Sequence, residues 1–198
     1  MMQFQEAAVF QNRSTNYQVG GDVDQFNTKP AIDAHLVCLH HLFEKQVERG
    51  PDRLALVCGE RNWSYEDLEV EANLLSLFLR EKGVGPGHYV GLTLDRSEWP
   101  IISILAILKA GGAYVPLEPG LPDERIRRIS ETAELSFALT GEAHKERLAG
   151  LLAGELLCLE DFRGWRRGRP APDRLSPVRI GLKDSDPCYV LFTSGSTG

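Results

Sequence analysis

The residues of this sequence that are best suited to chemistry form one run of glycine and hydroxyl side chains. They are Thr193, Ser194, Gly195, Ser196, Thr197 and Gly198. Glycines allow several backbone N–H groups to surround one anion, and hydroxyl groups add small hydrogen-bond donors. The β-branched and aromatic residues 189–192, directly before the run, are typical of a strand. The pattern therefore predicts a strand that ends in a phosphate-binding turn.

The spacing within this run excludes two common loops. A P-loop has four residues between its glycines and a lysine after the second, whereas two residues separate Gly195 from Gly198 and no lysine follows. The G-x-S-x-G pattern of a nucleophile elbow is not matched either. A flexible segment rich in serine and glycine is the remaining alternative. Because no lysine or arginine follows to meet phosphate charge, we expect the run to supply only half of a nucleotide site.

Composition narrows the class of protein. The chain is 42% hydrophobic and 25% charged, which is ordinary for a globular protein. A formal net charge of −6 argues against nucleic acid as a partner, because binding a polyanion requires a basic face. The longest apolar run, residues 101–108, is too short to cross a bilayer, and the first residues do not form a signal peptide. We therefore expect a cytoplasmic protein with no membrane and no nucleic acid as partner.

The cysteines and histidines show no metal-binding spacing. The four cysteines lie far apart in the sequence, at Cys38, Cys58, Cys158 and Cys188. The five histidines contain no H-x-x-x-H, and His40 and His41 are adjacent, which separates them by about 100° on a helix. We expect reduced, mostly buried thiols and neither a disulfide nor a zinc site.

The elements that must position the terminal run begin after a polar segment. Residues 1–34 lack helical or strand periodicity and are predicted to form a flexible leader. Apolar residues at helical spacing predict a helix over 36–47, and residues 54–65 predict a β-hairpin. Ser64, with Asp67 three residues later, is expected to cap the next helix. The predicted inner face of that helix is Leu68, Ala72, Leu75 and Leu79.

Strands and helices alternate from there onward. Strands are predicted at 88–94, 113–117, 135–139 and 156–159, and helices at 97–109, from 123, and at 143–152. This alternation predicts an α/β protein whose sheet is largely parallel and flanked by helices. Residues 162–187, rich in Arg, Pro and Gly, are expected to be a surface connection. Its basic cluster is expected to be solvated: Arg163, Arg166, Arg167 and Arg169.

Three segments, in order, resemble the core motifs of one family. Residues 63–68 (WSYEDL), 108–117 (LKAGGAYVPL) and 189–198 (YVLFTSGSTG) are similar to the first three motifs of the adenylation domains of nonribosomal peptide synthetases. These domains belong to the adenylate-forming (AMP-binding) enzyme superfamily. The resemblance covers residues 35–198. It implies the front part of the large N-terminal subdomain of such an enzyme, incomplete and truncated at the phosphate loop.

The resemblance implies a reaction, cofactors and partners. An amino or aryl acid would attack the α-phosphorus of Mg-ATP, giving an acyl-adenylate and pyrophosphate. The acyl group would then pass to the phosphopantetheine thiol of a peptidyl carrier protein, and a condensation domain is a further possible partner in the intact protein. Residues 193–198 would bind the ATP phosphates, whereas no catalytic residue and no Mg²⁺ ligand is assigned to this chain. The two earlier motifs are expected to be scaffold, and Lys109 is expected to face solvent at a helix end.

Three alternatives stay open at this point. The chain could be a fragment of an acyl-CoA synthetase, which is the nearest competitor within the superfamily. It could be a truncated product without turnover, and we expect the isolated chain to be inactive. It could also be an unrelated nucleotide-binding module, such as a small kinase, although a kinase has no use for residues 108–117.

Overall fold

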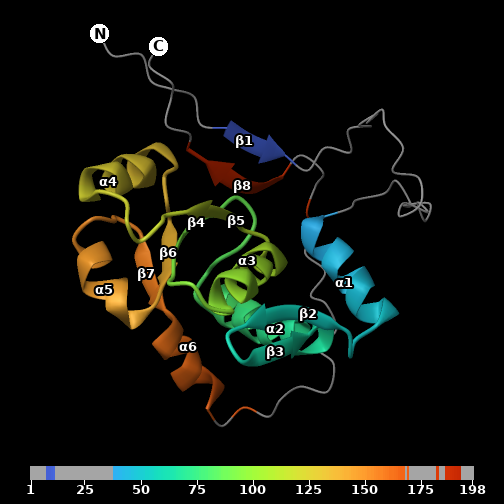
Figure 1. Cartoon of the computed structure of the whole chain (residues 1–198). Helices are drawn as coiled ribbons and strands as arrows, with labels where there is room; N and C mark the ends of the chain where they lie inside the picture. Colours follow the sequence, from blue (N-terminus) through green and yellow to red (C-terminus); the bar gives the residue numbers. More distant parts are fainter. Residues whose placement is uncertain (1–7, 12–37, 168, 170–181, 183–185, 193–198) are drawn as a thin grey trace, which may run out of the picture.

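The structure, a computed structural model, describes residues 8–11, 38–167, 169, 182 and 186–192. Strands and helices alternate along the chain (Figure 1). In order they are β1 (Ala8–Gln11), α1 (Leu39–Arg49), β2 (Leu54–Cys58), β3 (Arg61–Ser64), α2 (Tyr65–Glu81), β4 (Tyr89–Thr93), α3 (Trp99–Ala110), β5 (Ala113–Pro116), α4 (Asp123–Thr132), β6 (Phe137–Thr140), α5 (Glu142–Ala149), β7 (Glu155–Cys158), α6 (Leu159–Arg166) and β8 (Pro187–Leu191).

A six-stranded sheet lies at the centre, in the order β1-β8-β5-β4-β6-β7. The five strands from β8 to β7 run parallel, and β1 pairs antiparallel with β8 at the edge. In the middle of the sheet, Val90 of β4 lies opposite Tyr114 of β5 and Phe137 of β6. The predicted α/β fold with a largely parallel sheet is therefore confirmed.

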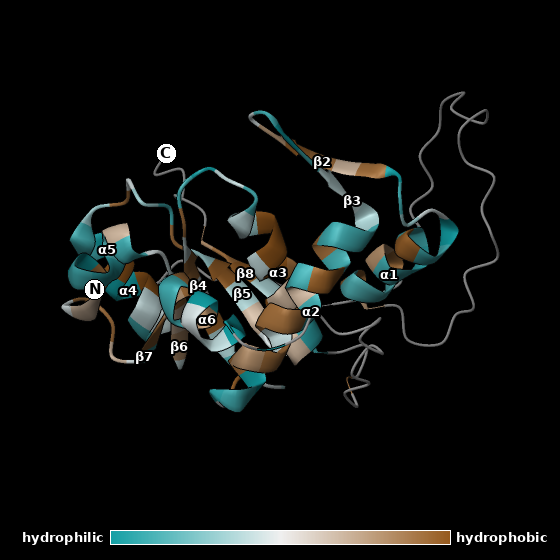
Figure 2. Cartoon of the chain, turned by 90° about the horizontal axis from the view of Figure 1, so that it is seen from below, coloured by the Kyte–Doolittle hydropathy of each residue, from teal (hydrophilic) through white to brown (hydrophobic). Residues whose placement is uncertain are grey.

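Helices cover both faces of this sheet. α2, α3 and α6 pack on one face in a hydrophobic cluster that includes Val90, Leu139 and Phe162. α4 and α5 pack on the other face in a cluster built on Val115 and Ile126. α3 is buried on nearly all sides, and its ribbon is largely brown in Figure 2. An almost uniformly apolar helix needs such a position because it has no polar face to turn toward water.

The hairpin and the first helix cap form as predicted. β2 and β3 pair antiparallel. The Asp67 backbone N–H donates to Ser64 Oγ at 3.0 Å, and the Ser64 N–H donates to Asp67 Oδ2 at 2.9 Å. This reciprocal capping box satisfies two backbone donors that the helix itself leaves without partners. The first motif is therefore structural, as expected.

The glycines of the second motif allow close packing. Gly111 ends α3 in the left-handed region, with φ of 93°. A β-carbon at Gly111 would lie 3.0 Å from the Pro86 ring, and one at Gly112 would lie 3.3 Å from the carbonyl oxygen of His88. Because both contacts are tighter than a side chain usually tolerates, glycine lets α3 turn directly into β5.

The prediction for Lys109 is wrong. Its side chain is only 5% exposed, and Nζ donates to Glu44 Oε1 at 2.5 Å and to Glu69 Oε1 at 2.9 Å. The two carboxylates come from α1 and α2, so the ammonium joins three helices. Nothing in the sequence indicated this burial, because the two partners of Lys109 lie 65 and 40 residues away in the chain. A lysine near a helix end was therefore expected to face solvent.

The expected surface connection is also corrected. Residues 159–166 form α6, so the strand predicted to reach Leu159 ends at Cys158. Phe162 is fully buried and packs with Trp165 against Phe78 of α2. The arginines of the predicted cluster are largely paired rather than simply solvated: Arg163 with Glu160, Arg166 with Glu71, and Arg169 with Glu81. Apolar side chains at 159, 162 and 165 have helical spacing, which the surrounding arginines and glycine masked.

Two further observations concern the predicted leader and membrane contact. Within residues 1–34 the structure describes only Ala8–Gln11, which form β1 where no strand was expected. This strand pairs with the far-separated β8, so its signal is not local. The rest of the predicted leader lies outside the described residues. Among the described helices, none has the length and apolar character needed to cross a membrane.

Candidate functional site at the carboxyl edge of the sheet

β8 positions the predicted phosphate-binding turn. The strand lies beside β5, with Tyr189 opposite Tyr114, and runs parallel to it. Residues 193–198, the predicted phosphate ligands, lie outside the described residues. The structure therefore shows where the strand that leads to them ends, on the same edge as the carboxyl ends of β5, β4, β6 and β7. We call this edge the carboxyl edge.

The strand order predicts a ligand crevice on the carboxyl edge. From β4 the chain passes through α3 to β5, whereas from β6 it passes through α5 in the other direction to β7, and α3 and α5 lie on opposite faces of the sheet. In open α/β sheets, ligands bind at the carboxyl ends of the two adjacent strands where the strand order reverses. Here those strands are β4 and β6, and β5 separates β8 from β4. The carboxyl end of β8 thus lies on the edge where the ligand crevice is expected.

Thr93 supplies an unusual polar group at this crevice. It is the last residue of β4 and only 1% exposed. Its Oγ1 is buried and has no hydrogen-bond partner among the described residues. A buried polar atom left without a partner costs about 1–3 kcal/mol and is rare in native proteins. The hydroxyl is therefore a candidate ligand group, which sequence reasoning missed.

Two side chains of α5 hold the loops of the carboxyl edge. His144 Nε2 lies 3.0 Å from Asp95 Oδ1 in the segment after β4. Arg147 pairs with Asp123 at 2.7 Å and donates to the carbonyl oxygens of Pro119 and Leu121 at 2.6 and 2.5 Å. These contacts order the loop after β5 and join it to α5. Because the guanidinium is engaged by three partners, it acts as a loop anchor.

Cys158, at the end of β7, is a protonated thiol. Its Sγ donates to Glu160 Oε2 at 2.8 Å and lies 3.3 Å from Glu142 Oε2. Burial and then the hydrogen bond to Glu160 raise the pKa of Cys158 to about 12. Burial raises the pKa of Glu160, but the thiol, backbone N–H groups and Arg163 lower it overall. A thiol with a raised pKa is a poor source of thiolate, and here it acts as a hydrogen-bond donor to Glu160.

Sequence signals for these residues were uneven. Thr93 had one usable signal, since the last residue of a parallel strand lies on the edge where ligands bind. The contact between Asp95 and His144 spans 49 residues and had none. The pairing of Cys158 with Glu160 was readable only if a helix was expected to start at Leu159.

Comparisons with known proteins agree with this architecture. Residues 43–198 match the family described as AMP-binding enzyme. Tyrocidine synthase 3 of Brevibacillus parabrevis is 40% identical over 81% of this chain, which is 2% of that protein. Gramicidin S synthase 2 of Brevibacillus brevis is 37% identical over 87% of this chain, which is 4% of that protein. The chain therefore spans only a small part of these relatives.

Solved structures show the same fold. The nonribosomal peptide synthetase FmoA3 in a form bound to α-methyl-L-serine-AMP matches with a TM-score of 0.64 and 30% identity, over 80% of this chain and 17% of that one. The N-terminal subdomain of Klebsiella oxytoca NpsA matches with a TM-score of 0.69 over 82% of this chain and 39% of that one, and at 24% identity shows the fold alone. Because the family match extends over most of its length, this chain belongs to the AMP-binding enzyme family.

Proposed function

We propose that this chain is the first part of an ATP-dependent adenylation domain that activates an amino or aryl acid. The observation that carries the proposal is the place of β8, whose carboxyl end lies on the same edge as the expected β4–β6 crevice and is separated from β4 by β5 alone. A turn that follows β8 there can direct backbone N–H and hydroxyl donors at the phosphates of a nucleotide in the crevice. Thr193 to Gly198 are the proposed donors.

The proposed reaction joins the acid to AMP. The carboxylate attacks the α-phosphorus of ATP, and pyrophosphate leaves. Donors fixed beside the departing pyrophosphate stabilise the charge that develops on it, which is the main requirement of phosphoryl chemistry. The acyl group then moves to the phosphopantetheine thiol of a peptidyl carrier protein, and a condensation domain is a further proposed partner.

The described side chains fit a nucleotide that arrives with a cation. The carboxyl edge offers the Thr93 hydroxyl, while Arg147 is already bonded to Asp123 and two carbonyl oxygens. Carboxylates such as Asp95 and Glu118 follow the same strands. Bound Mg²⁺ would supply the positive charge that ATP needs, and we assign no ligand for it within this chain.

A chimera tests the proposal directly. Residues 43–198 replace the matching segment in the adenylation domain of tyrocidine synthase 3, and ATP–pyrophosphate exchange is measured with a panel of amino and aryl acids. We expect exchange with at least one acid. A chimera with a native circular dichroism spectrum and no exchange would contradict the proposal.

Matched glycine variants locate the phosphate contact. Gly195→Ala should reduce exchange by about a hundredfold or more, on the scale of losing one oxyanion donor. Gly120→Ala is the control, because a β-carbon there meets nothing within 4 Å. Equal activity of the two variants would refute the assigned role of the turn. Transfer of the acyl group to coenzyme A rather than to a carrier protein would favour the acyl-CoA synthetase alternative.

A further inference from the structure

A second cluster of reactive side chains lies away from the carboxyl edge, at the start of α1. Cys38, His40 and His41 each offer one potential ligand atom, and these atoms all lie within 4.8 Å of one another. Cys38 and His40 are both 6% exposed, and His41 is half-buried. The proposed adenylation chemistry uses none of the three. Their proximity is unexpected from the sequence, which showed no metal-binding spacing.

One ionic network lies beside the cluster. The Lys109 ammonium contributes one positive charge, but it is bonded to two carboxylates, Glu44 and Glu69. This ionic network sums to −1. Cys38 is the N-cap residue of α1, where the helix dipole favours a negatively charged ligand such as a thiolate. A divalent ion bound by one thiolate and two neutral imidazoles would carry +1, which the network balances.

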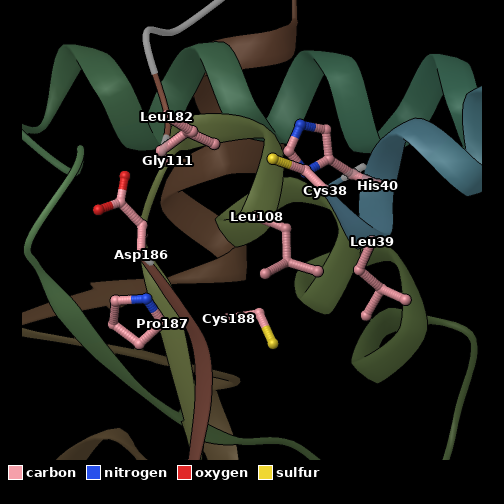
Figure 3. Close-up of a pocket in the computed structure, with 10 residues that line it drawn as sticks. Cys38, Leu39, His40, Leu108, Gly111, Leu182, Asp186, Pro187 and Cys188 are labelled. Atoms are coloured by element: carbon pink, nitrogen blue, oxygen red, sulfur yellow. The ribbon is translucent and has the colours of Figure 1, made fainter. Parts of the chain in front are cut away.

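The cluster opens on a small pocket. Cys38 and His40 line it together with Leu108, Gly111, Asp186 and Cys188. Figure 3 shows the Cys38 sulfur beside the His40 ring, with Asp186 and Cys188 farther away across the pocket. The centre of a water-sized particle has about 20 Å³ to move in, which is enough for a single water or metal ion.

We propose that Cys38, His40 and His41 form a Zn²⁺ site, with the fourth position directed to the pocket. Cysteine thiolate and imidazole are the ligands that zinc prefers, and three protein ligands with one open position is a common arrangement. Zinc bonds of about 2.0–2.3 Å hold ligand atoms roughly 3.5 Å apart. Zinc binding would therefore draw the three ligand atoms, now within 4.8 Å of one another, closer together. The ion would fix the first turn of α1 against the end of α3.

Cobalt titration of the purified 198-residue chain tests the site. Co²⁺ bound by one thiolate and two imidazoles gives a thiolate-to-metal charge-transfer band and the visible bands of tetrahedral cobalt. We expect both at one equivalent, and displacement by Zn²⁺. Cys38→Ser should abolish the charge-transfer band, whereas Cys58→Ser, the thiol control, should keep it. Absence of the band in the native chain, or its persistence in Cys38→Ser, overturns the proposal.

A histidine variant keeps the test decisive if Cys38→Ser fails to fold. His41 is half-buried, so His41→Gln should preserve the circular dichroism spectrum. Zinc affinity, measured by competition with a chromophoric chelator, should fall by at least about tenfold. His144→Gln, whose ring contacts Asp95 elsewhere in the fold, is the control and should bind zinc as the native chain does. Equal affinities for His41→Gln and His144→Gln would overturn the site.

Discussion

Replacing Lys109 by methionine should destabilise the fold strongly. The change keeps most of the apolar volume of the side chain but removes the ammonium that Glu44 and Glu69 share. Glu69 Oε2 is already buried without a hydrogen-bond partner among the described residues, and its Oε1 keeps only the contact with Asn73 Nδ2 at 3.0 Å. Removing one partner from a buried ionic group costs about 3–5 kcal/mol. That loss is a large fraction of the 5–15 kcal/mol by which typical domains are stable.

Urea denaturation followed by circular dichroism measures the effect. With a slope of about 2 kcal/mol per molar urea, the expected loss lowers the midpoint by about 1.5–2.5 M. Lys145→Met is the matched control, because Lys145 pairs with Glu142 at 3.5 Å on the surface and such pairs contribute at most about 1 kcal/mol. Similar midpoints for the two variants would refute the buried position of Lys109.

A compensating variant separates lost attraction from stranded charge. Lys109→Met combined with Glu44→Gln and Glu69→Gln removes the whole ionic network while keeping its shape. Replacing a complete buried ionic group by neutral residues is often neutral or stabilising. We therefore expect the triple variant to recover most of the urea midpoint lost in Lys109→Met. A triple variant that is less stable than the single one would show that the carboxylates have other essential partners.

Three further predictions follow from single residues. Gly111→Ala should lower the free energy of unfolding by about 1–3 kcal/mol, measured by heat or urea. Gly87→Ala is the control and should cost less. Both glycines have a positive φ, but only a β-carbon at Gly111 would meet a close neighbour. Stability should fall as pH drops from 6.5 toward 3, since the depressed pKa of His40 keeps it neutral in the folded state while the unfolded chain binds the proton. His40 should contribute a slope of up to about 1.4 kcal/mol per pH unit, and His40→Gln should lack that contribution. Cys158 should resist alkylation at pH 9 because its pKa is raised to about 12. If Cys158 is alkylated as fast as Cys58, the hydrogen bond from Cys158 to Glu160 is absent.

Elements with local signals could be predicted from the sequence. The capping box of Ser64 and Asp67 needs only residues three apart, and the turn at Gly111 needs only a helix pattern that ends in glycine. Alternating strands and helices were enough for the parallel sheet. β1 and α6 were missed because each is stabilised by a distant partner, β8 for β1 and α2 for α6. Local propensity was too weak there to outweigh a polar composition.

In the candidate site, too, only the features with a local sequence signal could be predicted. The phosphate-binding run at residues 193–198 could be recognised from its residue types alone. The sequence predicted that the strands run parallel, but it did not predict which strands are neighbours in the sheet. Which strands flank the crevice, and hence the importance of Thr93, depends on that order. The meeting of Cys38 with His41 depends on the bend at the start of α1, which no spacing rule for metal ligands covers.

The second motif shows why a charged residue in a family signature need not act on substrate. Lys109 lies at the end of α3 that is remote from the crevice, since α3 leaves the carboxyl end of β4 and returns to the start of β5. Its bonds to α1 and α2, together with the tight turn at Gly111, fix the position of the C-terminal end of α3. α3 in turn forms one wall beside β4. Lys109 therefore acts on the crevice only through the position of α3, and a variant at this site should lose stability before it loses any contact with a nucleotide.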